Sequence, residues 1–210
     1  SYSGPFTVNA TTPIIARTRV SASNWSGTDL ETYIIGTPAD VTNLVISEIH
    51  YHPSEPTPAE ITAGHTDQDD FEFLEVLNTS TDTIDLTDVT FSAGINFTFP
   101  TGTSLLPGQR LVIVKDQSAF LFRNPTVSPG SIAGEFQNAT GLSNGGETIT
   151  LNAANGTTIR SFTYDDEILW TEIPDGSGPS LVLINPTYLP DHDNGNNWRP
   201  SLAQHGTPAT

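Results

Sequence analysis

Isoleucine and leucine alternate with threonine and asparagine between residues 147 and 152, the period-two pattern of a β-strand with one wet face. Residues 157–164 are again rich in β-branched and aromatic side chains. Between the two runs, Asn155-Gly156 supplies the positive φ that a tight turn needs. The pattern predicts a β-hairpin over residues 144–166 that acts as scaffold, with candidate chemistry only at its acidic end.

Further strand signals recur at short spacing after residue 44, in 44–53, 69–91, 97–116 and 178–186. Glycine and proline interrupt the chain every few residues, and no window keeps the apolar spacing of a long helix. We therefore expect an all-β fold, with a β-sandwich as the leading architecture.

The chain divides into three parts by composition. Residues 1–36 hold three short strand candidates, residues 37–43 are predicted to be a linker because they lack periodicity, and residues 44–210 form the main domain. The first part has too few strands to bury its own apolar side chains, so we expect the main domain or a second molecule to cover it. The side chains concerned are Phe6, Val8, Ile14, Ile15, Val20, Ile34 and Ile35.

The charge balance excludes several classes of partner. Seven Lys and Arg stand against 24 Asp and Glu, giving a net charge of −17, so the chain lacks a cationic surface for nucleic acid or anionic membranes. It also lacks the run of roughly 20 apolar residues that a membrane-inserted helix needs. The absence of cysteine removes disulfides, thiolate catalysis and Cys-ligated zinc, and the absence of methionine predicts a processed or excised piece.

The N-terminal segment resembles the end of the fibronectin-like domain at the C-terminus of chitobiases and hexosaminidases. In that family a Gly-Pro opens a strand, an Ala-Arg strand follows, and a Trp-Ser precedes the last strand. The corresponding pairs are Gly4-Pro5, Ala16-Arg17 and Trp25-Ser26. The resemblance covers about the second half of such a domain, and an N-terminal extension packed on the main domain is the alternative.

Residues 44–200 carry a more specific resemblance, because several motifs occur in the order of one family. The motifs are Ser47-Glu48-Ile49, Glu72 to Asn78, Ile84-Asp85-Leu86, Phe99-Pro100 to Leu106-Pro107-Gly108, Leu142 to Leu151, Phe162 to Asp165, and Pro174-Asp175-Gly176 to Ser180-Leu181. Together they are similar to a bacterial lamin tail domain, which is an immunoglobulin-like sandwich.

This resemblance implies a non-catalytic structural or adhesion module in a large extracellular or cell-surface protein. The expected partners are neighbouring domains of the same polypeptide or other surface proteins. The alternative is a carbohydrate-binding module that serves a polysaccharide-active enzyme.

Three acidic loops are candidates for binding calcium, which takes six to eight oxygen ligands. One loop precedes a strand, one ends the hairpin, and one, the sequence DHDNGNN over residues 191–197, resembles half of an EF-hand without its bidentate glutamate. The candidate ligands are Asp67, Asp69, Asp70, Asp165, Asp166, Asp191 and Asp193. Solvated surface charge is the alternative interpretation.

Two further constellations have weaker support. His50 and His52 on one strand face, with His65 in a nearby loop, are candidate zinc ligands, although packing is the simpler interpretation. Glu48 and Glu75 could act as paired glycosidase carboxylates only if neighbouring strands bring them together. No Gly-x-Ser-x-Gly elbow supports serine hydrolysis.

Exposed aromatic rings could stack on sugars, as they do in carbohydrate-binding modules. We take Trp170 and Tyr188 as the candidate ligand-binding residues, and we expect Trp198 to pack in the interior. Packing of Trp170 in the core or between domains is the alternative, because aromatic side chains dominate both environments.

Overall fold

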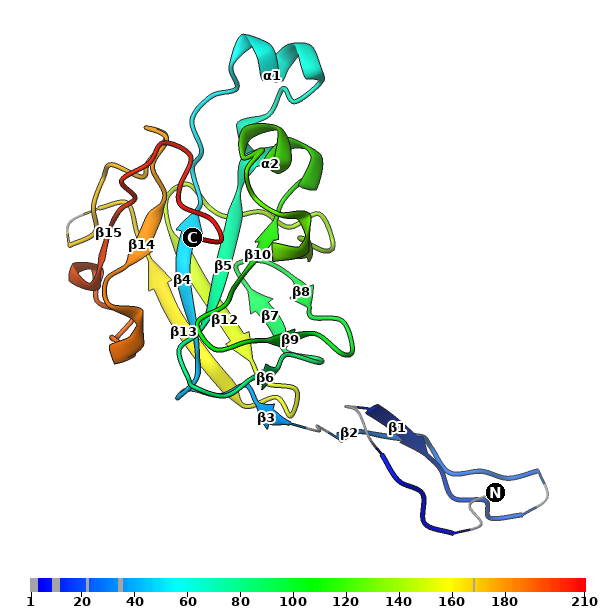
Figure 1. Cartoon of the computed structure of the whole chain (residues 1–210). Helices are drawn as coiled ribbons and strands as arrows, with labels where there is room; N and C mark the ends of the chain where they lie inside the picture. The colour runs from blue at the N-terminus through cyan, green and yellow to red at the C-terminus, as the bar shows by residue number, and fades with distance from the viewer. Residues whose placement is uncertain (1–3, 9–11, 22, 34–35, 168) are drawn as a thin grey trace.

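A computed structural model describes residues 4–8, 12–21, 23–33, 36–167 and 169–210, and it consists mainly of strands. Two sheets pack face to face (Figure 1). The larger has six strands in the order β11-β10-β5-β4-β14-β15, and the smaller has four in the order β13-β12-β7-β8. The six are β4 (Leu44–His50), β5 (Phe73–Asn78), β10 (Arg110–Val114), β11 (Ile132–Glu135), β14 (Leu181–Leu183) and β15 (Trp198–Pro200). The four are β7 (Thr90–Ala93), β8 (Phe97–Thr98), β12 (Glu147–Asn152) and β13 (Thr158–Tyr164).

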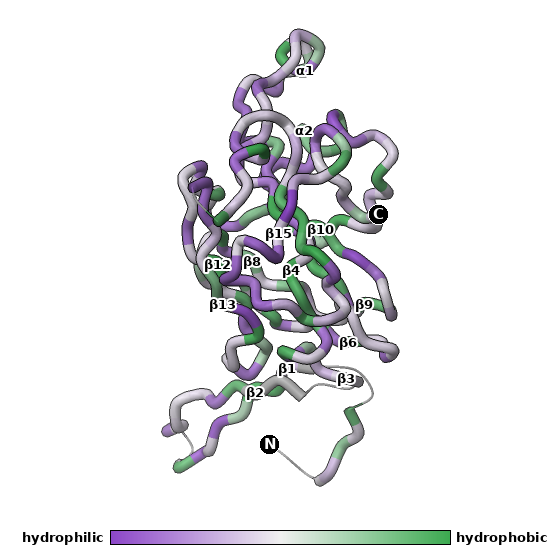
Figure 2. Tube along the Cα trace, turned by 90° about the vertical axis from the view of Figure 1, so that its left-hand side faces the viewer, coloured by the Kyte–Doolittle hydropathy of each residue, from purple (hydrophilic) through white to green (hydrophobic). Residues whose placement is uncertain are grey.

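The main core fills the space between these sheets, which confirms the expected all-β sandwich. Ile149 and Leu151 of β12 are fully buried, as their alternation predicts, and Gly156 turns the hairpin with φ of 82°. Hydrophobic residues are concentrated along β4 and β10 (Figure 2). The largest fully buried side chains are Tyr51, Tyr164, Phe71, Phe73, Phe99 and Phe120.

The outer face of the six-stranded sheet is covered as well. Phe73, Val112, Val114 and Phe120 form a second small core there. It is closed by helix α2 (Gln117–Arg123) and by residues 201–210, which we call the C-terminal strap. Because both faces are covered, every residue of β4 is buried.

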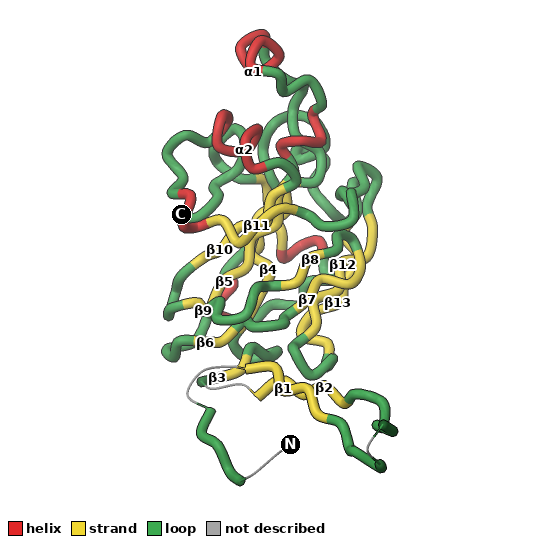
Figure 3. Tube along the Cα trace, turned by 90° about the vertical axis from the view of Figure 1, so that its right-hand side faces the viewer, coloured by secondary structure: helices red, strands yellow, loops and turns green. Residues whose placement is uncertain are grey.

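The short α-helices of the described chain lie at one end of the sandwich (Figure 3), and sequence periodicity did not reveal them. Helix α1 (Pro58–Ala63) begins with a capping box between Thr57 and Glu60, and the Asp116 side chain caps α2. The described residues also form short 3₁₀ segments: η1 (Gln68–Phe71), η2 (Pro129–Ser131), η3 (Pro186–Tyr188) and η4 (Gly195–Asn197). None of the helices in the described part of the chain has the length and apolar character to cross a bilayer.

Residues 37–43, predicted to be a linker, belong instead to the body of the sandwich. Strand β3 (Thr37–Pro38) pairs with β6 (Ile84–Asp85), which pairs in turn with β9 (Ser104–Leu105), and Ala39 is buried in the main core. The pairing partners are distant in sequence, and a two-residue strand is too short to show a period.

The N-terminal segment is a two-stranded hairpin of β1 (Thr12–Ala16) and β2 (Asp29–Tyr33) that projects from the base of the sandwich (Figure 1). Its described apolar side chains are largely exposed, so the expected coverage by the chain's own domain is not observed, and coverage by a second molecule stays a prediction. The exposed side chains are Phe6, Ile15, Val20, Trp25 and Leu30. The third strand candidate forms β2, and Ile34 and Ile35 at its end lie outside the described residues.

Candidate functional site

Two buried glutamates face each other on the outer side of the six-stranded sheet. Glu48 of β4 and Glu75 of β5 are paired directly across the two strands, because the register shifts by one residue between Ile46 and Glu48. This β-bulge turns both Ser47 and Glu48 to the outer face. Both carboxylates are almost inaccessible to solvent, with exposed fractions of 1% and 0%.

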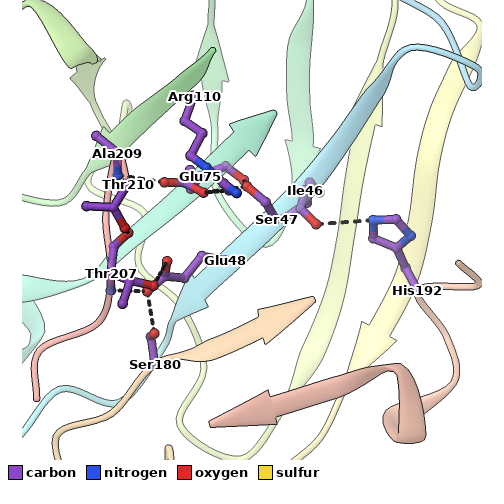
Figure 4. Close-up of polar contacts among 10 residues, drawn as sticks. All are labelled: Ile46, Ser47, Glu48, Glu75, Arg110, Ser180, His192, Thr207, Ala209 and Thr210. Carbon is purple, nitrogen blue, oxygen red and sulfur yellow. Dashed lines mark hydrogen bonds and ion pairs between the residues drawn. The ribbon is translucent and has the colours of Figure 1, made fainter. Parts of the chain in front are cut away.

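The C-terminal strap lies over this carboxylate pair (Figure 4). The Thr207 amide donates to Glu48 Oε1 at 2.7 Å, and the Thr207 hydroxyl donates to Glu48 Oε2 at 2.9 Å. Two residues later, the Ala209 amide donates to Glu75 Oε2 at 2.7 Å. The two side chains therefore hold the strap mainly through its backbone.

The remaining carboxylate hydrogen bonds come from the sheet itself. Ser180 Oγ donates to Glu48 Oε1, Ser47 Oγ donates to Glu75 Oε1, and Arg110 forms an ion pair with the same Glu75 oxygen at 2.7 Å. All four carboxylate oxygens thus accept a hydrogen bond. The arrangement binds peptide groups and leaves no carboxylate oxygen free for a substrate.

Burial raises the pKa of Glu48 to about 7, with the charge of Glu75 as the second cause. Hydrogen bonds from Ser180 and Thr207 oppose this shift, because they stabilise the carboxylate. Glu48 consequently titrates near neutral pH while it stays covered by the strap.

A buried histidine lies beside the bulge, on the other side of β4. His192 Nε2 lies 3.2 Å from the carbonyl oxygen of Ile46, and Nδ1 lies 3.0 Å from that of Pro190 (Figure 4). Trp198 Nε1 donates to the His192 carbonyl at 2.9 Å. Burial lowers the pKa of His192 to about 4, and nearby Arg160 contributes to the shift.

Glu72 is a third buried carboxylate, located just before β5. Its Oε2 accepts a hydrogen bond from the Leu142 amide at 2.9 Å, while Oε1 has no hydrogen-bond partner among the described residues. Burial raises its pKa to about 8, and the negative charge of Asp69 adds to the effect. Glu72 therefore anchors the loop that leads into the β12–β13 hairpin, and its raised pKa favours the protonated form near neutral pH.

The predicted calcium ligands lie in three separate loops, where several act as turn caps. Asp67 accepts from the Asp69 amide, and Asp165 accepts from the Glu167 amide. The residues that the structure describes contain no group of three or more His, Asp or Glu side chains able to hold a metal ion.

The C-terminal acidic loop is tied into the sandwich. Asp191 accepts from the Asp193 amide at 3.1 Å, and Asp193 accepts from the Thr163 amide of β13 at 2.8 Å. His192 between them is buried against Phe162 and Trp198. This loop contributes packing and hydrogen bonds to the fold.

Asp70 and Asp166 are both partly buried, and Asp166 lies at the end of the hairpin. Burial raises the pKa of Asp70, and the charges of Asp116 and Asp67 add to it. A cation would relieve this repulsion, so calcium binding at residues 67–70 stays a prediction.

If calcium binds this loop, the melting temperature of the chain should rise, because a ligand that binds only the folded state stabilises it. The measurement is a thermal melt in calcium, in magnesium at the same concentration, and in chelator. Magnesium controls for general screening of the acidic surface. Identical melting temperatures in all three conditions would show that calcium does not bind the folded chain.

The candidate zinc histidines have three different environments. His50 Nε2 lies 3.1 Å from the Gly178 carbonyl oxygen in the interior, and burial lowers its pKa to about 3. His52 lies past the end of β4 and contacts Asp175. The ring of His65 packs against Phe71 and Phe122. Packing therefore accounts for His50 and His65, and the contact with Asp175 accounts for His52.

The two candidate sugar-binding aromatics differ in exposure. Trp170 is half-buried, packs on the main core, and lies 6.0 Å from the Trp198 ring. Trp198 is buried, as predicted. Tyr188 is 84% exposed and ends a 3₁₀ turn between two residues in the left-handed region, Asn185 and Leu189. Only Tyr188 of the pair presents an open ring.

Sequence patterns did not reveal the strap residues that complete the carboxylate site. Thr207 and Ala209 carry no periodic or motif signal, and they contact residues more than a hundred positions away.

Comparison with known proteins gives one match. The family model described as Lamin Tail Domain matches residues 37–166. Neither a curated protein nor a solved structure matches the chain. The match begins at β3, so the N-terminal hairpin lies outside it. The match ends before β14 and β15, although these two strands belong to the six-stranded sheet together with the matched strands β4, β5, β10 and β11. The family match and the packed sheets agree on an immunoglobulin-like sandwich, and the chain belongs to the lamin tail domain family.

Proposed function

We propose that this chain is a non-catalytic structural or adhesion module of a larger extracellular or cell-surface protein. The observation that supports this function best is the use of the buried Glu48 and Glu75 to hold the chain's own backbone. A hydrolytic carboxylate pair needs free oxygens and access for the substrate and water, whereas these two are covered and fully hydrogen-bonded. The immunoglobulin-like family fold supports the same function.

The surface chemistry sets the kind of neighbour that the module can have. A net charge of −17 keeps the chain soluble and repels anionic polymers, so its partners are neighbouring domains of the same polypeptide or other surface proteins with neutral or basic faces. The N-terminal hairpin, with its resemblance to a fibronectin-like domain end, is the proposed junction to a preceding domain.

Carbohydrate binding is the second candidate function, and the exposed ring of Tyr188 is the observation that favours it. An aromatic side chain that is 84% exposed on a tight turn is available to stack on a sugar ring.

A glycan array separates the two functions. The structural function predicts no specific glycan signal from the full chain. Specific binding that is lost in Tyr188→Ala and kept in Thr187→Ala would establish the carbohydrate-binding function instead. Both variants alter exposed side chains, so the fold should be unaffected.

A further inference from the structure

The strap is recognised mainly through groups that any peptide carries. Two amides at a two-residue spacing, those of Thr207 and Ala209, donate to the carboxylates of Glu48 and Glu75. From the strap, the Thr207 hydroxyl adds a side-chain hydrogen bond to Glu48. Charge-assisted hydrogen bonds of this kind are about twice as strong as neutral ones. The sheet therefore offers a preformed binding surface for a short peptide.

Shape sets a further requirement on that peptide. A Cβ added at Gly206 would lie 2.6 Å from Glu48 Oε1 and 2.7 Å from the Phe73 ring, so only glycine fits. Pro208 is buried, and Ala209 packs on the second small core. The surface therefore selects the pattern glycine, threonine, proline and a small residue.

The strap's own fit to the surface is incomplete. His205 and Ala209 adopt φ of 67° and 62°, the left-handed region that non-glycine residues rarely occupy. A pocket of about 390 Å³ stays open between the strap and the segment from Asn124 to Ser131. A peptide with a larger side chain at the edge of the strap could fill this space.

The strap is also joined to the sandwich by an exposed connection. Ser201 is fixed to Ser180, and His205 to Gly178, by hydrogen bonds of 2.9 to 3.0 Å. Between them Leu202 is 94% exposed, and Ala203 and Gln204 are exposed as well. Rotation in these three residues would let residues 205–210 leave the sheet. This would uncover the second small core, while the main core between the two sheets would stay covered.

We propose that the outer face of β4 and β5 is a peptide-binding site, that the strap occupies it as a replaceable internal ligand, and that its external ligand is an uncharged Gly-Thr-Pro-small segment of another polypeptide. Acidic segments are excluded, because they would meet two buried carboxylates. The inference goes beyond the proposed function, since a spacer or adhesion module needs no such site.

A chain whose strap can be cut after folding tests this directly. A protease recognition sequence inserted after Leu202 leaves the full chain intact until cleavage. The probe is a fluorescent synthetic peptide with the sequence of residues 203–210, and its binding is measured by anisotropy before and after cleavage. We expect at least ~10-fold tighter binding after cleavage, because the tethered strap competes at an effective concentration in the millimolar range.

Peptide variants identify the contacts. A peptide with Gly206→Val should not bind, and one with an N-methyl group on the Ala209 amide should bind at least ~10-fold more weakly, because it loses a charge-assisted hydrogen bond. A peptide with Ala203→Ser should bind like the original.

Two results would overturn the inference. In one, the cleaved chain stays folded by circular dichroism but binds the peptide no better than the uncleaved chain. In the other, the sandwich unfolds on cleavage, which would make the strap an integral part of the fold. Neither result affects the proposed function, which the glycan array tests separately.

Discussion

Arg123→Ala is expected to lower the free energy of unfolding by about 3–5 kcal/mol, the usual cost of leaving one partner of a buried ion pair uncompensated. Arg123 on α2 forms a two-point ion pair with Glu60 on α1, with N–O distances of 2.7 and 3.0 Å. Only 2% and 5% of the two side chains is exposed. The guanidinium also lies 3.4 Å above the Phe71 ring and donates to the Ser54 carbonyl. The substitution removes all of these contacts together.

Urea unfolding followed by tryptophan fluorescence measures this effect. Arg199→Ala is the matched control, because the Arg199 side chain is exposed and donates to the backbone oxygen of its neighbour Pro200. We expect the control to change stability by less than about 0.5 kcal/mol. Equal effects of the two substitutions would show that the ion pair between α1 and α2 contributes nothing to the fold.

The stability of the chain should be greatest in mildly acidic solution and should fall by roughly 3 kcal/mol between about pH 6 and pH 9. Burial raises the pKa of Glu48 to about 7 and that of Glu72 to about 8. A carboxyl whose pKa is raised by folding binds more protons in the folded state. The stabilising contribution of each carboxyl is complete below its pKa in the unfolded chain, which is about 4.5. This contribution is lost as the pH rises through the pKa of the carboxyl in the folded chain.

The buried histidines produce a decline on the acidic side. Burial lowers the pKa of His50 to about 3 and that of His192 to about 4. Their stabilising contribution is complete above the unfolded pKa of about 6.5 and is lost as the pH falls toward the folded values. Between about pH 4.5 and 6.5, a rise in pH lowers the stabilising contribution of the carboxyls and raises that of the histidines. These two effects offset each other, so we expect a broad maximum of stability there.

Denaturant unfolding across this pH range gives the measurement, and Glu48→Gln gives the control. Glutamine keeps an acceptor for the Thr207 amide and cannot ionise, so the alkaline decline should be smaller in the variant. A wild-type stability that stays level or rises from neutral to alkaline pH would show that these carboxyls are not held in a desolvated state.

Local periodicity predicted the strands whose partners are close in sequence or whose pattern is long. The β12–β13 hairpin follows from alternation and from Asn155-Gly156, and β10 follows from the apolar run ending at Val114. Helix α1 is only six residues long, which is too short for a helical period, although its capping box of Thr57 and Glu60 is a readable signal.

The candidate site could be predicted only in part, because it depends on pairing between distant segments. The sequence raised the possibility that Glu48 and Glu75 meet across neighbouring strands, but the bulge at Ser47 that turns Glu48 to the outer face beside Glu75 leaves no trace in residue order. Aspartates suit calcium loops and turn caps equally well, so composition alone could not show that Asp67 caps η1 or that Asp193 binds the Thr163 amide.

We propose that the buried carboxylates of Glu48 and Glu75 hold the chain's own C-terminal strap and do not catalyse a reaction. The most direct measurement is hydrolysis of a panel of chromogenic glycosides and polysaccharides by the full chain and by Glu48→Gln, at equal concentration and with both proteins shown to be folded. We expect the wild-type chain and Glu48→Gln to show the same background rate of hydrolysis on every substrate. Turnover by the wild-type chain that Glu48→Gln abolishes would contradict this proposal.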